Sequence, residues 1–150
     1  MRKENVLIAG EESGGLAFQN YMLERDGILT GLLIIQMMAY RNQKFETILK
    51  NVEKEFGKFY YIRNDIKIPE KSKLKVLKLL QETQIQSIAG SRVLERKTLD
   101  GVKFTFENDA WLLFRMSGTE PLLRIYAEST DSAQAKAFVD WGQSHAFSVK

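Results

Sequence analysis

Between Ile28 and Tyr40 lies the longest apolar run of the chain, and it limits what the first third of the sequence can form. The run falls well short of the roughly 20 residues that span a bilayer, and it contains Thr30, Gly31 and Gln36. We therefore expect a buried helix, capped at its start by Asp26. Such a helix is apolar on nearly every side, so it must be covered from several directions.

The neighbouring segments offer little to cover this helix. Residues 6–9 are predicted to form a short apolar strand, residues 16–19 a second one, and residues 45–56 an amphipathic helix that ends at Gly57. One or two short strands are too few to bury the apolar run. We therefore interpret residues 1–57 as a fragment of a larger α/β domain.

Residues 58–150 predict a self-sufficient α+β domain. Strands are expected at residues 59–68, 93–98, 102–107, 111–115 and 122–128, and helices at residues 72–84 and from Asp131 onwards. Asp100-Gly101 favours a hairpin turn between two of these strands. The buried helix residues are expected to be Leu74, Leu77 and Leu80, then Ala137, Phe138 and Trp141. We predict an antiparallel sheet of four strands with both helices on one face.

Composition excludes several kinds of site. The chain has no cysteine, which excludes disulfides, thiolate nucleophiles and thiolate metal ligands. Its single histidine, His145, cannot form a multi-histidine metal site and is expected to be a solvated or capping residue. The net charge of +3 favours anionic ligands only weakly, because acidic and basic residues are interleaved. We expect a soluble, cytoplasmic protein with no nucleic-acid partner and no membrane contact.

The stretch RMSGTEPLLR at residues 115–124 concentrates groups that bind anions. Ser117 and Thr119 offer hydroxyl donors, and Gly118 lets consecutive backbone N–H groups turn towards one point. A hairpin would bring the Arg115 and Arg124 guanidiniums to the same rim, where their planar donors suit phosphate. The stretch predicts a phosphate-binding loop. The alternative is a polar surface hairpin with two incidental arginines.

The stretch GEESGG at residues 10–15 is a second polar loop. Its carboxylates and hydroxyl, including Glu11 and Ser13, are suited to hydrogen bonding with sugar hydroxyls or to coordinating a hard cation. A flexible, solvated turn has the same composition.

Taken together, the two motifs carry a family resemblance. Gly10-Glu11-Glu12-Ser13-Gly14, followed by RMSGTEP and Arg124-Ile125-Tyr126-Ala127-Glu128, resembles the C-terminal part of the α-D-phosphohexomutases, closest to the phosphoglucomutase and phosphomannomutase branch. The segment Glu24-Arg25-Asp26-Gly27-Ile28-Leu29 is similar to the stretch after the sugar loop of that family. The motifs occur in the family's order and span nearly the whole chain.

This resemblance implies a fold and a set of roles. Residues 1–57 would belong to the third, sugar-binding domain of a four-domain enzyme, and residues 58–150 to the fourth domain, which has a TATA-binding-protein-like fold. The family interconverts hexose 1- and 6-phosphates with a phosphoserine and Mg²⁺ in its earlier domains, and glucose 1,6-bisphosphate is expected for the full-length parent. Carried over by position, the sugar contacts would be Glu11 and Ser13, and the non-reacting phosphate would be held by Arg115, Ser117, Gly118, Thr119 and Arg124.

The chain also departs from the family pattern. Gly15 stands where many members have histidine, which leaves the preferred hexose open, whether glucose, mannose or an amino sugar. The sequence has no Ser-His-Asn nucleophile loop and no Asp-Gly-Asp metal loop. We therefore expect a substrate-binding portion, for a phosphorylated hexose, that is inactive alone. The alternative is a non-enzymatic phosphate-binding or interaction module, whose partner is the missing N-terminal domains or a second copy bound through residues 28–40.

Overall fold

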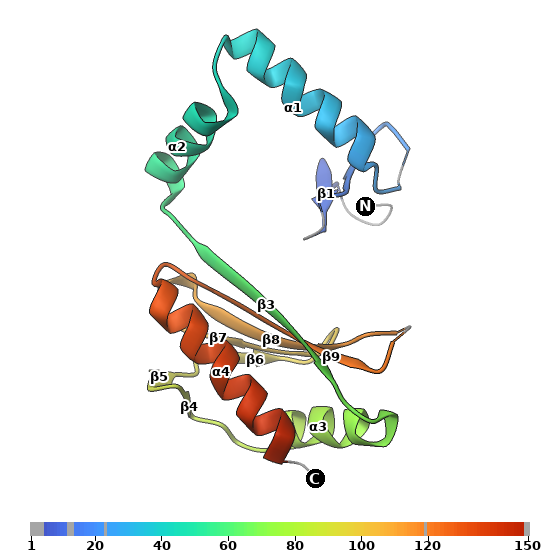
Figure 1. The fold of residues 1–150 in the computed structure, drawn as a ribbon, viewed down its shortest axis with the longest axis vertical. Coiled ribbons are helices and arrows are strands. Elements are labelled where there is room, and N and C mark those ends of the chain that lie inside the picture. The colour runs from blue at the N-terminus through green and yellow to red at the C-terminus, as the bar shows by residue number, and fades with distance from the viewer. Residues whose placement is uncertain (1–4, 12–13, 23, 119, 149–150) are drawn as a thin grey trace. The chain divides into compact units, whose positions relative to one another are not determined.

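The computed structural model describes residues 5–11, 14–22, 24–118 and 120–148, without the side chains of residues 70, 71, 73, 147 and 148. Its contacts divide the chain into two compact units, residues 1–56 and residues 57–150. The units are described separately (Figure 1).

The first unit consists of a small hairpin and two helices. Strands β1 (Ile8–Gly10) and β2 (Leu16–Phe18) pair antiparallel. Helix α1 (Gly27–Arg41) begins where the Asp26 side chain accepts a hydrogen bond from the Leu29 N–H at 2.8 Å, as expected from the sequence. It ends at Asn42, whose φ of 50° is left-handed. Helix α2 (Phe45–Phe56) follows with the predicted bounds.

Helix α1 is not buried, which corrects the prediction. Thr30 is its one buried residue, whereas Ile28 is 82% exposed and Tyr40 is 91% exposed. The physical reason is that the two strands of this unit have three residues each and provide too little surface to cover an apolar helix. The element is therefore a helix with an uncovered apolar surface within the first unit.

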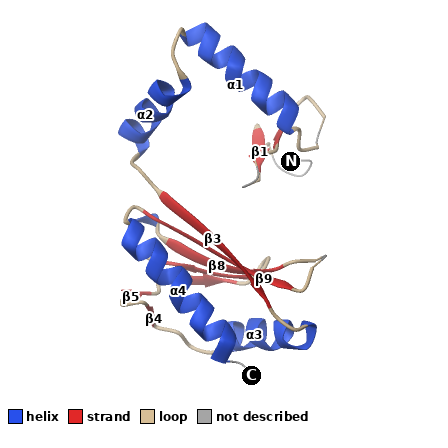
Figure 2. Cartoon of the chain, viewed as in Figure 1, coloured by secondary structure: helices blue, strands red, loops and turns tan. Residues whose placement is uncertain are grey.

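The second unit is an α+β domain, as predicted. In chain order its larger elements are β3 (Tyr60–Lys67), α3 (Glu70–Glu82), β6 (Glu95–Lys97), β7 (Val102–Thr105), β8 (Trp111–Met116), β9 (Leu122–Ser129) and α4 (Ser132–Ser148). A short hairpin of β4 (Ser87–Ile88) and β5 (Ser91–Arg92) lies between α3 and β6, and a 3₁₀ turn, η1 (Glu107–Asp109), lies between β7 and β8. Figure 2 shows the helices and strands of both units.

Strands β3, β6, β7, β8 and β9 form one antiparallel sheet in the order β3-β9-β8-β7-β6. It therefore has five strands where four were predicted. All five strands expected from the sequence join this sheet, and the one expected at residues 93–98 is the short edge strand β6, which pairs with β7 across the turn that contains Asp100-Gly101. The β4–β5 hairpin was not predicted, because two residues per strand are too few for a periodic pattern.

Both helices of the second unit pack on one face of the sheet, as predicted. The strands present alternate residues to this face, and these join one core with residues of α3 and α4. Within that core, the Phe106 and Phe138 rings stack at 4.2 Å. One detail of the prediction is wrong, because Leu74 is 75% exposed while Val76, at 1%, takes its place in the core beside Leu80. Ala137 is only half-buried, whereas Phe138 and Val139 are buried.

No helix of the second unit's described residues packs on the opposite face of the sheet, which gathers aromatic and charged side chains. The Arg63 guanidinium lies 5.6 Å from the centre of the Tyr126 ring, and Lys103 Nζ lies 4.5 Å from that of Trp111. Trp111 Nε1 donates to the Glu128 carboxylate at 3.0 Å. Arg115 and Arg124 share this face.

In the described ranges, no helix combines the length and the apolar character that a membrane crossing requires.

Candidate phosphate-binding site

The predicted phosphate loop connects β8 to β9, and its two arginines lie opposite each other. Arg115 and Arg124 are Cα partners in the antiparallel ladder, and one more pair, Met116 and Leu123, lies between them and the turn. Like charges in direct cross-strand register destabilise a sheet, so this pair has no advantage for stability. Such a pair suits a ligand that carries negative charge.

Ser117 lies inside this turn and is only 5% exposed. Its N–H donates to the Leu122 carbonyl at 3.0 Å, and its Oγ accepts the Glu120 N–H at 3.2 Å. Gly118 follows, and an added Cβ there would meet no atom within 4 Å. The loop therefore has a buried hydroxyl next to an open backbone position. Thr119, the remaining predicted loop ligand, lies outside the described residues.

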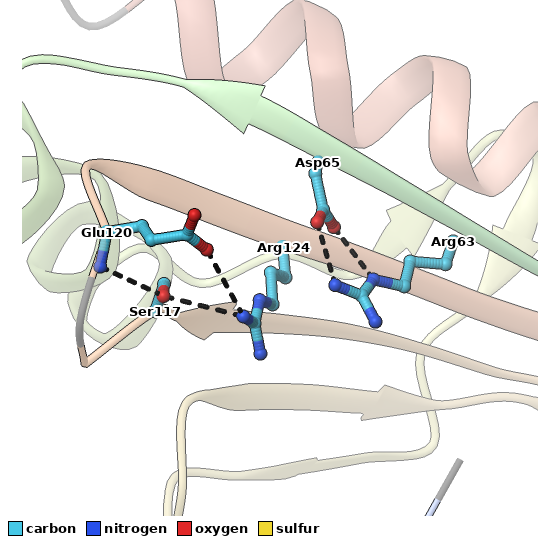
Figure 3. A network of polar contacts seen from close by, with 5 residues as sticks. All are labelled: Arg63, Asp65, Ser117, Glu120 and Arg124. Atoms are coloured by element: carbon cyan, nitrogen blue, oxygen red, sulfur yellow. Dashed lines mark hydrogen bonds and ion pairs between the residues drawn. The ribbon is translucent and has the colours of Figure 1, made fainter. Parts of the chain in front are cut away.

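Arg124 is held in place but incompletely hydrogen-bonded. Its side chain is 23% exposed, and Nη2 lies 3.5 Å from Ser117 Oγ and 3.8 Å from a Glu120 carboxylate oxygen (Figure 3). Its Nε is buried and has no hydrogen-bond partner among the described residues. Because a buried donor without a partner is costly, the guanidinium gains from an additional acceptor such as a phosphate oxygen.

Arg115 has a different counter-ion. Its Nε lies 3.0 Å from an Asp100 carboxylate oxygen, and Asp100 belongs to the turn between β6 and β7. Both side chains are well exposed, at 42% for Arg115 and 71% for Asp100. The two arginines of the loop thus face two different carboxylates.

Strand β3 adds a charged pair that was not predicted from the sequence. Asp65 is the Cα partner of Arg124, and it accepts two hydrogen bonds from Arg63, at 2.8 and 2.7 Å (Figure 3). The hydrogen bonding and charge of Arg63, with the charge of Arg124, lower the pKa of Asp65 below its usual value. The sequence of residues 59–68 predicts the strand itself. Only the register between β3 and β9 shows that Asp65 lies beside Arg124 of the loop.

The predicted sugar loop lies in the first unit, between β1 and β2. The Glu11 carboxylate pairs with Arg25 at 2.5 Å, while Ser13 lies outside the described residues. An added Cβ on Gly15 would lie 2.9 Å from a Glu11 carboxylate oxygen and 3.0 Å from Arg25 Cβ, so glycine leaves room for this pair. Arg25 belongs to the quoted segment Glu24–Leu29, but no role was predicted for it.

In the part of the chain that the structure describes, no cluster of three or more His, Cys, Asp or Glu residues is suited to hold a metal ion. His145 stacks on Trp141 with ring centres 3.8 Å apart, and its Nδ1 lies 3.0 Å from the Trp141 carbonyl oxygen.

The predicted site residues thus divide between the two units. The structure brings Arg115, Ser117, Gly118 and Arg124 to one hairpin end, whereas Glu11 belongs to the other unit.

Two models of protein-family domains match the chain. The model of the phosphoglucomutase/phosphomannomutase alpha/beta/alpha domain III matches residues 1–56, and the model of the phosphoglucomutase/phosphomannomutase C-terminal domain matches residues 65–140. The chain belongs to the phosphoglucomutase/phosphomannomutase family. It corresponds to a C-terminal part of such a phosphohexomutase.

Individual relatives agree with this family. A phosphoglucomutase/phosphomannomutase of Thermococcus kodakarensis is 31% identical over 93% of this chain and 28% of its own length. A phosphoglucosamine mutase of Methanococcus maripaludis is 32% identical over 96% of this chain and 30% of its own length. The chain thus spans a little under a third of these relatives.

Solved structures share the fold. A phosphoglucomutase/phosphomannomutase family protein of Burkholderia thailandensis matches with a TM-score of 0.71 at 18% identity, over 99% of this chain and 29% of its own. The open form of the Paramecium phosphoglucomutase parafusin matches with a TM-score of 0.67 at 24% identity, over 94% of this chain and 30% of its own.

Proposed function

We propose that the chain is the substrate-binding C-terminal portion of an enzyme that interconverts hexose 1- and 6-phosphates. Residues 1–57 would supply the sugar-binding part, through Glu11 and Ser13, and residues 58–150 the phosphate-binding part. The non-reacting phosphate would be held by Arg115, Ser117, Gly118, Thr119 and Arg124. The observation that carries this proposal is the cross-strand pair Arg115–Arg124 beside the buried Ser117.

The chemistry of this hairpin end fits the proposed role. A phosphate dianion offsets the repulsion between the two guanidiniums and gives the buried Arg124 Nε an acceptor. In a phosphoryl-transfer enzyme, binding energy at a non-reacting phosphate can be used to orient the sugar at the reacting end. Hydroxyl, amide and guanidinium donors recognise the phosphate and not the carbon that carries it. The loop would therefore accept the sugar in either direction.

A titration tests the phosphate-binding role. Glucose 1,6-bisphosphate is added to the ¹⁵N-labelled chain, with inorganic sulfate as the second probe, and amide shifts are followed by NMR. Arg115→Ala and Arg124→Ala should each weaken binding about tenfold or more, since each loses a charge-assisted contact worth roughly 1.5–3 kcal/mol. Arg92→Ala, which removes an exposed arginine of β5, is the control. Parent-like affinity in both loop variants would refute the site. Shifts at Glu11 would support a sugar-binding role for the first unit.

Catalysis is not expected from the chain alone. The donor phosphoserine and Mg²⁺ would belong to other domains of a full-length enzyme, since the sequence has neither the nucleophile loop nor the metal loop of the family. A mutase assay with Mg²⁺ and glucose 1,6-bisphosphate should give no turnover. Turnover by the purified chain would contradict this part of the proposal.

The uncovered apolar surface of α1 favours a second candidate, an interaction module. Ile28, Ile35 and Tyr40 are 82%, 63% and 91% exposed, and several exposed apolar side chains on one helix are typical of a surface that a partner covers. The partner would be the remaining N-terminal domains or a second copy of the chain. Sedimentation and binding of a hydrophobic dye test it, and a monomer that binds no dye would argue against it.

A further inference from the structure

The arginine pair of the loop raises a question about the chain without ligand. Arg115 and Arg124 are Cα partners on adjacent strands, so their positive charges repel each other. Each has a carboxylate nearby, Asp100 at 3.0 Å from Arg115 and Glu120 at 3.8 Å from Arg124. The two carboxylates come from different turns, one between β6 and β7 and one between β8 and β9.

We propose that Asp100 and Glu120 are built-in counter-ions of the arginine pair, and that a phosphate must displace their carboxylates to bind. This inference rests on the proposed phosphate-binding role of the loop. The two acidic residues would weaken anion binding, whereas the phosphate-binding residues of the loop strengthen it. They keep the arginine pair in place while the site holds no ligand.

A third acidic residue shows the difference between a fixed and an exchangeable counter-ion. Asp65 accepts two hydrogen bonds from Arg63, at 2.8 and 2.7 Å, and its side chain is 32% exposed. The Glu120 contact with Arg124, at 3.8 Å, is longer than a hydrogen bond, and the Glu120 side chain is 58% exposed. Asp65 is therefore a fixed part of the sheet face.

Displacing the two proposed counter-ions requires little rearrangement. The Asp100 and Glu120 side chains are 71% and 58% exposed, so their carboxylates can turn into water and be hydrated there. The groups that face these carboxylates, Nε of Arg115 and Nη2 of Arg124, are then free to bind phosphate oxygens together with the Arg124 Nε. Competition of this kind lowers affinity and speeds release of the phosphate. Fast release suits a site that must let go of one end of a sugar and accept the other, since uniformly tight binding does not speed the reaction.

Two substitutions remove the charges while keeping the shapes. Glu120→Gln keeps the length of the side chain, and Asp100→Asn gives Asn-Gly, a dipeptide that also favours a tight hairpin turn. The control is Glu82→Gln on α3, because Glu82 likewise forms an exposed ion pair at 3.8 Å, with Lys78. Inorganic sulfate is the probe. Its dissociation constant is measured by NMR at constant ionic strength for the 150-residue chain and for each of its variants.

Each substitution should tighten sulfate binding about threefold to tenfold, and the double variant more than either one, because a negative charge beside the anion is lost. The gain should shrink at high salt. Glu82→Gln should bind sulfate as the parent does. The Nε–Hε resonance of Arg115 should also shift in the ligand-free Asp100→Asn chain, which reports the lost contact directly.

The outcomes separate this inference from the proposed function. If Arg124→Ala loses sulfate binding while Glu120→Gln and Asp100→Asn bind sulfate as tightly as the parent or less tightly, the counter-ion inference is wrong and the phosphate site stands. If Arg115→Ala and Arg124→Ala both bind sulfate like the parent, the phosphate site is wrong and the counter-ion inference falls with it.

Discussion

Within strands β8 and β9, most cross-strand pairs follow the requirements of packing. Phe114 opposes Ile125 and both are buried, as expected for the core face of a sheet. The next pair, Arg115 opposite Arg124, breaks this pattern with two like charges. Positions at which a sequence departs from the rules of stability are where function is expected. The departure is local, because Met116 and Leu123 form an apolar pair at the following position.

Asp65 gives a prediction about acid stability at the scale of one residue. Its pKa is lowered from 3.8, so its folded carboxylate contributes stability that is fully present above that value and is lost as the pH falls through the lowered pKa. Asp65→Asn should therefore have a lower melting temperature than the parent at neutral pH, and the difference should shrink as the pH falls below 3.8 and through the lowered pKa of Asp65. Thermal unfolding followed by circular dichroism across this range measures it, with Glu82→Gln as the control. A difference that persists at the acidic end would show that lost packing, and not charge, is the cause.

Helices α3 and α4 are fixed to the sheet by different means. The end of α3 is held by Arg96 of β6, whose guanidinium donates to the carbonyl oxygens of Leu80 and Thr83 at 3.2 and 2.6 Å. These bonds use carbonyls that a helix end leaves without partners. Helix α4 instead comes close to the sheet at Gly142, where an added Cβ would lie 3.0 Å from the Phe114 ring. Small size at this position sets how closely α4 packs.

Gly142→Ala tests this close packing. In an open helix this change would stabilise by up to about 1 kcal/mol, because alanine is the better helix former. Here the added methyl would meet Phe114 at 3.0 Å and the Ile125 Cγ2 at 3.1 Å, so we expect a net destabilisation of roughly 1–3 kcal/mol. Urea unfolding measures the effect, and Ser144→Ala on the exposed side of the same helix is the control. A stabilised Gly142→Ala chain would show that α4 does not pack this closely.

The whole molecule consists of two units with very different cores. The buried cluster extends from Ile66 to Ala146 and so lies entirely in the second unit. In the first unit, few apolar residues are buried, among them Ala17 and Ile48. Because burial of apolar surface is the main stabilising contribution to folding, the second unit is expected to be the stable one.

A shortened chain of residues 57–150 tests this difference. It should keep the five-stranded sheet, with amide resonances of β7, β8 and β9 at the positions seen in the full chain. The first unit, expressed alone, should show weak protection from hydrogen exchange and bind a hydrophobic dye. Loss of dispersed resonances in the shortened chain would mean that the second unit needs residues 1–56 to fold.

The sequence by itself determined the type and order of the larger elements, because periodicity, Asp26 as a cap and Asp100-Gly101 as a turn act over short distances along the chain. It also determined that residues 115–124 form a hairpin end rich in anion-binding groups. The sequence did not predict the shortest strands, since β4 and β5 have only two residues each. The burial of α1 was predicted wrongly, because periodicity describes the helix and not what covers it.

Tertiary structure alone decided which distant residues meet. Register between β3 and β9 places Asp65 beside Arg124, and the turn after β6 brings Asp100 to Arg115. A shift of one residue in either strand of such a pair would move these side chains to the opposite face. The charges that surround the phosphate loop therefore depend on strand pairing across many residues, which no local pattern encodes.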